Sequence, residues 1–151
     1  MKEDESGEFT PHVTIATIIE RDGKLLFVEE MSGGERVLNQ PAGHLEANES
    51  LLEAAVREAY EETGWRVAIT ALLGIALYRS AQSGITYCRT TLIGEALSFD
   101  QNARIDSAIV DTHWLTLDEA RQHAVRPRSP LVLACAEQFL QGVAYPLDIL
   151  S

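Results

Sequence analysis

Short apolar runs alternate with turn signals along the first forty residues. Residues 12–20 are rich in Val, Ile and Thr, and residues 24–30 hold a second run, Leu-Leu-Phe-Val. Between them stands Arg21-Asp22-Gly23, and Asp-Gly between two apolar runs is a strong signal for a tight hairpin. A second turn signal at 32–35 precedes a short extended piece at 37–40. The chain is therefore predicted to open with a β-hairpin and a further short strand.

The period of the pattern changes after residue 50. Apolar side chains then recur at helical spacing at Leu52, Ala55, Val56 and Ala59. Ser50 followed three residues later by Glu53 is typical of a capping box at a helix N-terminus. Gly64 stands where a left-handed residue would end the helix. A helix over 51–63 is predicted, with both of its ends specified by the sequence.

The rest of the chain indicates a sheet with two further helices. Extended segments are expected at 67–69, 72–79 and 86–97, and in a strand that ends at 112–115. A polar loop is expected at 98–106, a short helix at 117–123, and a last helix from Pro130 to about 141. We therefore expect an α+β or α/β fold with a mixed sheet sandwiched between helices. One domain at 9–151 would follow a disordered start at 1–8.

Composition and charge restrict the partners. The chain has 151 residues, 46% of them hydrophobic, with 12 basic and 23 acidic side chains and a net charge of −11. So acidic a protein is a poor partner for nucleic acid polymers and for anionic membranes. A small phosphorylated ligand remains compatible, provided that positive charge is supplied locally. No segment is typical of a signal peptide or a membrane span, and Cys88 and Cys135 match no metal or redox spacing, so a cytoplasmic protein with free thiols is expected.

Three carboxylates on the predicted helix could provide that positive charge by binding a cation. Glu58, Glu61 and Glu62 stand at i, i+3 and i+4, which places them on one patch of the helix surface. Such a cluster could simply be a solvated acidic face. Oxygen ligands gathered in this way also suit a hard divalent cation, Mg²⁺ or Mn²⁺, which can bridge phosphate oxygens and activate a water molecule.

The surroundings of the cluster resemble a known family. Residues 43–65 read G-x5-E-x7-REAYEETGW, which matches the box G-x5-E-x7-REUxEExGU of the Nudix (MutT-like) hydrolases, where U is bulky or apolar. Stretches at 11–16, 39–47, 128–131 and 145–147 are similar to the NudJ phosphatase subgroup. This resemblance implies a Mg²⁺-dependent enzyme, with Mn²⁺ as a possible substitute. Its substrates would be nucleoside di- and triphosphates and thiamine-type pyrophosphates.

The resemblance also assigns roles to residues. Glu58, Glu61 and Glu62 would bind the metal, together with the backbone carbonyl of Ala42. Arg57 would orient these glutamates and pair with Glu49, a partner that its forked guanidinium suits. Gly43 and Gly64 would serve backbone geometry. The chain has Ala42 where the wider family usually has a glycine, and Leu38 where a tryptophan is common.

The general base and the substrate contacts are less sharply indicated. Glu61 or Glu62 could take the proton from water, or Asp106 or Glu95 could do so from another segment. Asp106 could equally be a loop-capping residue. The candidate substrate contacts are Asn39, Gln40, His44 and Arg89, with Tyr78, Tyr87, Arg126 and Arg128 as further possibilities.

Three hypotheses for the function follow from these residues. The first is a NudJ-like phosphatase that acts on small pyrophosphate compounds, as a monomer or homodimer. The second is a Nudix pyrophosphatase for ADP-ribose, sugar nucleotides or dinucleoside polyphosphates. The third is a non-catalytic nucleotide-sensing module, which would have no need for so many mutually repelling carboxylates.

Overall fold

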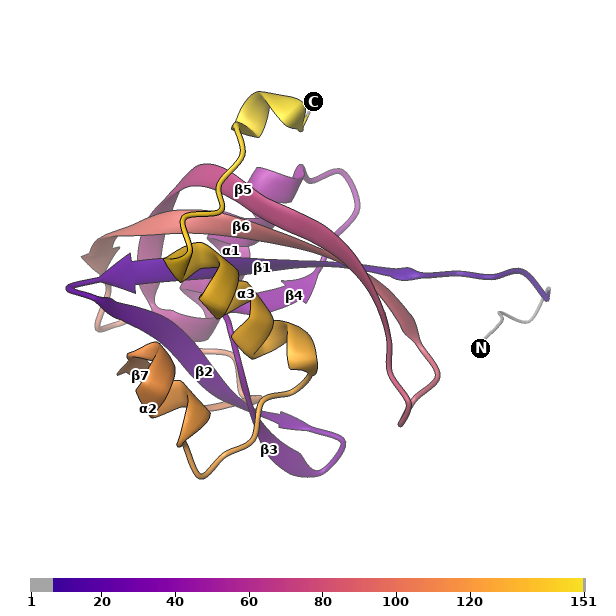
Figure 1. The fold of residues 1–151 in the computed structure, drawn as a ribbon, viewed down its shortest axis with the longest axis horizontal. Helices are drawn as coiled ribbons and strands as arrows, with labels where there is room; N and C mark the ends of the chain where they lie inside the picture. The colour runs from indigo at the N-terminus through magenta and orange to yellow at the C-terminus, as the bar shows by residue number, and fades with distance from the viewer. Residues whose placement is uncertain (1–6, 151) are drawn as a thin grey trace.

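The structure is a computed structural model that describes residues 7–150 (Figure 1). Most of the segment expected to be disordered, residues 1–6, lies outside these described residues. The strands are β1 His12–Arg21, β2 Lys24–Ser32, β3 Glu35–Asn39, β4 Ala42–His44, β5 Trp65–Arg79, β6 Thr86–Phe99 and β7 Ile109–Leu115. The helices are α1 Leu51–Thr63, α2 Leu117–Arg121, α3 Pro130–Leu140 and the short 3₁₀ helix η1 Leu147–Ile149. Within the described residues, no helix is both long and apolar enough to cross a membrane.

The seven strands found in residues 7–150 form one mixed sheet in the order β3-β2-β1-β6-β5, with β4 paired to β1 and β7 to β2. The predicted hairpin is confirmed, because Arg21 pairs with Lys24 and the two turn residues Asp22 and Gly23 have φ of 53° and 77°. At the centre of the sheet, β1 and β6 run parallel. The other pairings are antiparallel, which makes the sheet mixed, as expected.

Helices cover both faces of this sheet, as the sequence predicted (Figure 1). On one face, Ile18 of β1 packs in a cluster with Val132 and Ala136 of α3. On the other face, Ile15 packs in a cluster with Ala54 and Ala55 of α1. Because successive side chains of a strand point to opposite faces, a continuous apolar run in β1 can fill both layers of the core.

The long strand β5 differs from the sequence prediction. Two extended pieces at 67–69 and 72–79 were expected, but a single strand runs from Trp65 to Arg79. Its pairing with β6 shifts register between Ile69 and Ala71 and again between Leu72 and Gly74. Irregularities of this kind insert an extra residue and bend the strand without ending it. They break the apolar alternation, which is why the sequence pattern suggested two strands.

The connection between α2 and α3 is attached to the edge of the sheet. Leu38 of β3 donates its N–H to the carbonyl of Arg126 at 2.8 Å and accepts the N–H of Arg128 at 2.9 Å. Pro127 lies between them in a parallel bridge with Leu38. The segment 126–128 therefore continues the sheet beyond β3, and we call it the edge segment.

Candidate active site

Helix α1 is fixed at both ends by the residues that the sequence indicated. The Ser50 hydroxyl accepts the N–H of Glu53 at 3.1 Å, and the Glu53 carboxylate accepts the N–H of Ser50 at 3.2 Å. At the other end Gly64 has φ of 78°, in the left-handed region that glycine adopts most easily. The predicted capping box and C-terminal glycine are both confirmed. The caps define where α1 begins and ends, and the packing of Ala54, Ala55 and Ala59 against β1 sets its rotation on the sheet.

That rotation presses two carboxylates of α1 against β4. A methyl group at Gly43 would lie 2.2 Å from the carboxyl carbon of Glu58, so the Glu58 side chain occupies the space that any larger residue would need. The N–H of Ala42 donates to Glu62 at 2.8 Å. Glycine is therefore needed at position 43 to let the Glu58 carboxylate come this close to the strand. The carboxylates of α1 contact the backbone of β4 directly.

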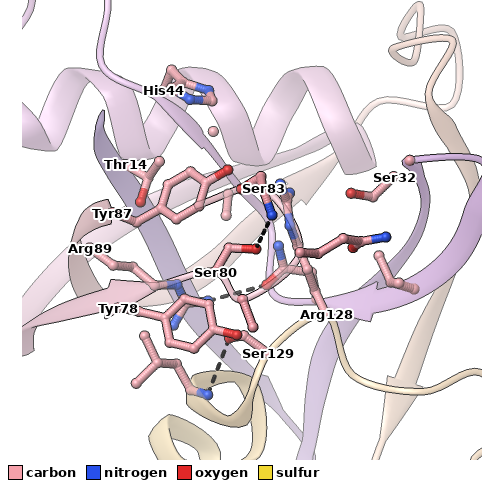
Figure 2. Close-up of a pocket in the computed structure, with 18 of the residues that line it drawn as sticks. Thr14, Ser32, His44, Tyr78, Ser80, Ser83, Tyr87, Arg89, Arg128 and Ser129 are labelled. Carbon is pink, nitrogen blue, oxygen red and sulfur yellow. Dashed lines mark hydrogen bonds between the residues drawn. The ribbon is translucent and has the colours of Figure 1, made fainter. Parts of the chain in front are cut away.

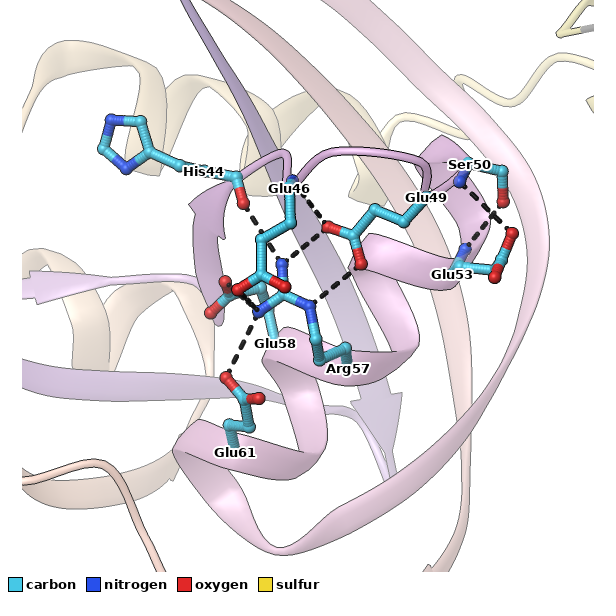
Figure 3. A network of polar contacts seen from close by, with 8 residues as sticks. All are labelled: His44, Glu46, Glu49, Ser50, Glu53, Arg57, Glu58 and Glu61. Carbon is cyan, nitrogen blue, oxygen red and sulfur yellow. Dashed lines mark hydrogen bonds and ion pairs between the residues drawn. The ribbon is translucent and has the colours of Figure 1, made fainter.

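Arg57 joins the loop after β4 to the helix (Figure 3). Its Nε and Nη2 donate to the two oxygens of Glu49 at 2.9 and 2.7 Å, which is the pairing that the sequence predicted. Nη2 also donates to the carbonyl of His44 at 3.1 Å, and Nη1 donates to Glu58 at 2.7 Å and to Glu61 at 3.2 Å. The hydrogen bonds from Arg57 lower the pKa of Glu49. One guanidinium thus holds a loop carboxylate and two helix carboxylates in place.

Two of the clustered carboxylates are unusually hard to ionise without a cation. Burial raises the pKa of Glu62 to about 9, and the nearby carboxylates of Glu30, Glu58 and Asp106 add to the effect. Burial also raises the pKa of Glu58. A carboxylate that is desolvated and surrounded by like charges is stabilised by an added cation. The electrostatics of this group are therefore those of a site that favours positive charge.

The donor set also fits a hard divalent metal. Glu58, Glu61 and Glu62 present carboxylate oxygens from one helix face, beside the backbone of Ala42. Oxygen donors of this kind suit Mg²⁺ or Mn²⁺ better than softer transition metals. The carbonyl of Ala42 remains a predicted fourth ligand.

A second cluster in the described chain combines Glu29, His113 and His123 within 4.8 Å of one another. The Nε2 atom of His113 lies 2.6 Å from Glu29. His123 accepts the N–H of Val125 at Nδ1, so its ring proton is on Nε2, the atom that faces Glu29 at 3.8 Å. A nitrogen that carries a proton cannot bind a metal. The α1 carboxylates therefore remain the predicted cation site.

The candidate general bases lie at different distances from this site. Asp106 is close, since its N–H donates to the carbonyl of Glu61 at 2.9 Å and its charge contributes to the raised pKa of Glu62. It also caps its own turn, with Oδ1 accepting the N–H of Ala108 at 2.9 Å. Glu95 lies in β6 opposite Glu20, at the other end of β1 from β4. Its position does not bring it to the carboxylate cluster.

A cavity of about 660 Å³ opens beside β4 (Figure 2). Its walls come from β4, from the tips of the hairpins at 32–33 and 80–83, from β6, and from the edge segment with the start of α3. Tyr78 and Tyr87 face each other in the register of β5 and β6, and both line this space. A turn was predicted at 32–35, but no local pattern in the sequence could show that this tip and the tip at 80–83 would line one cavity.

The four predicted substrate contacts are placed differently. Asn39, His44 and Arg89 line the cavity. Gln40 does not line it, because the side chain is 1% exposed and both ends of its amide are bonded inside the protein. Its nitrogen donates to the carbonyl of Val132 at 2.7 Å and its oxygen accepts from Arg89 at 2.7 Å. Gln40 is thus placed to support Arg89 from below the cavity surface.

Comparison with known proteins identifies the family and the fold. The NUDIX domain family matches residues 8–134. This chain belongs to the Nudix family. The phosphatase NudJ of Escherichia coli strain K12 is 37% identical over 143 residues, which cover 95% of this chain and 92% of the relative. A Nudix hydrolase structure from Nitrosomonas europaea is 45% identical with a TM-score of 0.90, covering 94% of this chain and 97% of that one.

More distant structures share the Nudix fold. A UDP-X diphosphatase, 21% identical, superposes with a TM-score of 0.70 over 95% of this chain and 70% of its own. An ADP-ribose pyrophosphatase from Streptococcus suis, 17% identical, gives 0.67 over 90% and 96%. At such identities only the fold is common. As a Nudix hydrolase, the protein is an enzyme that hydrolyses phosphorus-containing anhydrides of small phosphorylated substrates, and the family generally uses a divalent metal.

Proposed function

We propose that this Nudix hydrolase is a Mg²⁺-dependent phosphatase of the NudJ type, acting on nucleoside di- and triphosphates and on thiamine-type pyrophosphates. The observation that carries the proposal is the contact of the partly buried Glu58 and the buried Glu62 with the backbone of Gly43 and Ala42, two residues that line the cavity. The similarity to the phosphatase NudJ over 95% of the chain supports phosphatase activity.

In this proposal the metal is held by Glu58, Glu61, Glu62 and the Ala42 carbonyl, with Mn²⁺ able to replace Mg²⁺. A bound Mg²⁺ would offset the negative charge that develops on the phosphate oxygens. Arg57 keeps the carboxylates of Glu58 and Glu61 oriented through its two Nη1 hydrogen bonds.

Water must lose a proton as it attacks phosphorus, and a carboxylate near α1 would accept that proton. Glu61, Glu62 and Asp106 are the candidates that the geometry brings together. The Asp106→Asn substitution distinguishes Asp106 from the two glutamates. The amide keeps the side-chain oxygen that caps the turn, but it cannot act as a base. If Asp106 is the base, kcat should fall by about 10²- to 10⁴-fold while substrate KM changes little.

The compartment and the assembly complete the proposal. Cys88 and Cys135 are both free, which is consistent with a reducing compartment such as the cytoplasm. We propose a single catalytic domain over 9–151 that works there as a monomer or homodimer.

A turnover panel with defined Mg²⁺ tests the proposed activity, with Glu62→Gln as the inactive reference. The substrates are nucleoside di- and triphosphates, thiamine pyrophosphate, ADP-ribose and dinucleoside polyphosphates, and the products are separated by chromatography. Orthophosphate from the first two groups, absent with Glu62→Gln, is the expected result. Release of nucleoside monophosphates from ADP-ribose or dinucleotides alone would replace the phosphatase with a Nudix pyrophosphatase.

A further inference from the structure

The cavity lining has the opposite charge balance to the rest of the molecule. The chain carries a net charge of −11, yet the described residues that line the cavity include Arg89, Arg126 and Arg128 and no Asp or Glu. In an acidic protein, a pocket whose charged lining residues are all cations is unexpected unless the molecule that it binds is negative. The charge partners of the three arginines show where that occupant would be needed.

Two of the arginines form ion pairs with carboxylates outside the lining. Arg126 forms an ion pair with Glu35 at the rim, where both side chains are more than half exposed. Arg128 donates to the buried carboxylate of Glu30 at 3.0 Å. These two pairs hold the guanidinium groups of the edge segment against the sheet.

Arg89 has a different environment. It is 8% exposed, and the acceptors around its guanidinium are neutral. Nη2 donates to Gln40 at 2.7 Å and to Asn39 at 3.2 Å, and Nη1 donates to Thr91 at 3.3 Å and to Cys135 at 3.5 Å. Burial lowers the pKa of Arg89, which reflects the poor stabilisation of its charge. Glu30 also acts on this charge, but it is already paired with Arg128. A buried cation whose direct hydrogen-bond partners are neutral is stabilised further when an anion arrives.

The sheet places this cation in line with the proposed metal site. Thr14 of β1 pairs with Arg89 of β6 on one side and with His44 of β4 on the other. All three residues line the cavity (Figure 2). Since neighbouring strands lie about 4.8 Å apart, the backbones of Arg89 and His44 are separated by about 10 Å. Ala42 and Gly43, which contact Glu62 and Glu58, line the same cavity, so the cavity connects Arg89 with the backbone beside the α1 carboxylates.

We propose that the cavity around Arg89, with Arg128 beside it, is a subsite for an anionic group of the substrate that works without metal. This inference rests on the proposed function, because it assumes that the anhydride to be cleaved lies at the α1 carboxylates. A nucleoside triphosphate would place its additional phosphate here, whereas thiamine pyrophosphate would bring a cationic thiazolium ring. The subsite thus favours nucleoside triphosphates over thiamine pyrophosphate.

The first test measures anion binding in the absence of metal. Inorganic pyrophosphate is titrated calorimetrically into the protein in EDTA, using wild type, Arg89→Met, Arg128→Gln and the control Arg121→Gln. Arg121 lies on α2, outside the cavity, and the Arg121→Gln substitution removes the same charge as the cavity variants do. We expect affinity to fall by about tenfold or more in the two cavity variants and to stay unchanged in the control.

Thermal denaturation checks that Arg89→Met is folded. If it is not, Arg128→Gln still decides, because that side chain is 40% exposed and Glu30 keeps its hydrogen bond from Asn39. The proposal is overturned if the wild-type protein does not bind pyrophosphate in EDTA, or if the cavity variants bind it as tightly as the control does.

The second test compares substrates at saturating Mg²⁺. The Arg128→Gln and Arg89→Met substitutions should lower kcat/KM for a nucleoside triphosphate about tenfold more than for thiamine pyrophosphate. An equal loss for both substrates would mean that Arg89 only holds Asn39 and Gln40 in place, and it would refute the subsite. If no pyrophosphate compound is turned over, the proposed function fails, while binding in EDTA still reports on the subsite alone.

Discussion

At Gly43, the backbone of β4 and the carboxylate of Glu58 share the space that a methyl group would occupy. A Gly43→Ala substitution would push the carboxylate away, because the end of a glutamate side chain moves more easily than a strand. We expect stability to change by less than about 1 kcal/mol. Mg²⁺-dependent kcat/KM should nevertheless fall by about 10- to 100-fold, the usual effect of displacing groups around a metal.

Gly74 provides the matched control for this substitution, since a methyl group there would meet no atom within 4 Å. Gly74→Ala should retain both activity and stability, as measured by the same kinetic assay and by chemical denaturation. Full activity in Gly43→Ala would show that the position of Glu58 against β4 is not needed for turnover.

Glu62 should make the metal-free enzyme less stable as the pH rises. Its pKa in the folded protein is about 9, above the ordinary 4.5, so its stabilising contribution is complete below 4.5 and is lost as pH approaches 9. The glutamine in Glu62→Gln cannot ionise. The free energy of unfolding of this variant should therefore rise relative to the wild type by at least about 1 kcal/mol between pH values of about 5 and about 9. Denaturant unfolding in EDTA measures the difference, and added Mg²⁺ should reduce it.

Glu119→Gln is the control for this pH series. Hydrogen bonds from Thr116 lower the pKa of Glu119, so its contribution is present above the ordinary pKa and is lost only as the pH falls below it. Its stability difference from the wild type should stay constant over the same range. A constant difference in Glu62→Gln as well would contradict the effect of burial on Glu62.

Among the elements, α1 was the most predictable, because its signals are local. The capping box, the C-terminal glycine and the glutamate spacing all lie within one stretch of about fifteen residues. Val56 shows the limit of this reasoning. It is apolar and at helical spacing but 39% exposed, because the helix packs against the sheet through the alanine face of Ala54, Ala55 and Ala59 instead.

Other parts of the candidate site depend on contacts between distant elements, so their positions could not be predicted even where the residue itself, such as Arg89, was a candidate. Strand β4 has three residues, too few for a period to appear in the sequence. Arg89 reaches the site only because β1 lies between β4 and β6. The buried state of its guanidinium depends on Gln40 and Asn39, which are about fifty residues earlier in the chain.

The caps of α1 should contribute to stability rather than to chemistry. Ser50→Ala removes the hydroxyl that accepts the Glu53 N–H and should lower the free energy of unfolding by about 1 kcal/mol. Thr116→Ala removes the same contact at the start of α2, away from the carboxylate cluster. Both variants should keep a kcat/KM close to the wild-type value in the Mg²⁺ assay. Loss of activity in a stable Ser50→Ala protein would give Ser50 a role in the site itself.

For the whole molecule, the net charge of −11 opposes the approach of an anionic substrate, whereas the cavity attracts it over a shorter range. Screening by salt distinguishes the two effects, since the Debye length falls from about 30 Å at 0.01 M to about 8 Å at 0.15 M. At constant free Mg²⁺, kcat/KM should therefore rise roughly two- to fivefold over this range, opposite to normal electrostatic steering. A steady fall with added KCl would show that the cavity charge dominates at long range.

The edge segment has a consequence for how substrate preference can diversify. Its backbone is bonded to Leu38, so replacing residues 126–128 with a loop of another length would expose the N–H and carbonyl of an edge strand. The hairpin tip at 80–83 forms its hydrogen bonds within its own turn, from Ser80 to Ile85 and from Gly84 to Ser80. Insertions and exchanges are tolerated best in such a turn. New substrate specificities, whether selected or engineered, should therefore arise through changes in the 80–83 tip, while Arg126 and Arg128 of the edge segment stay in place.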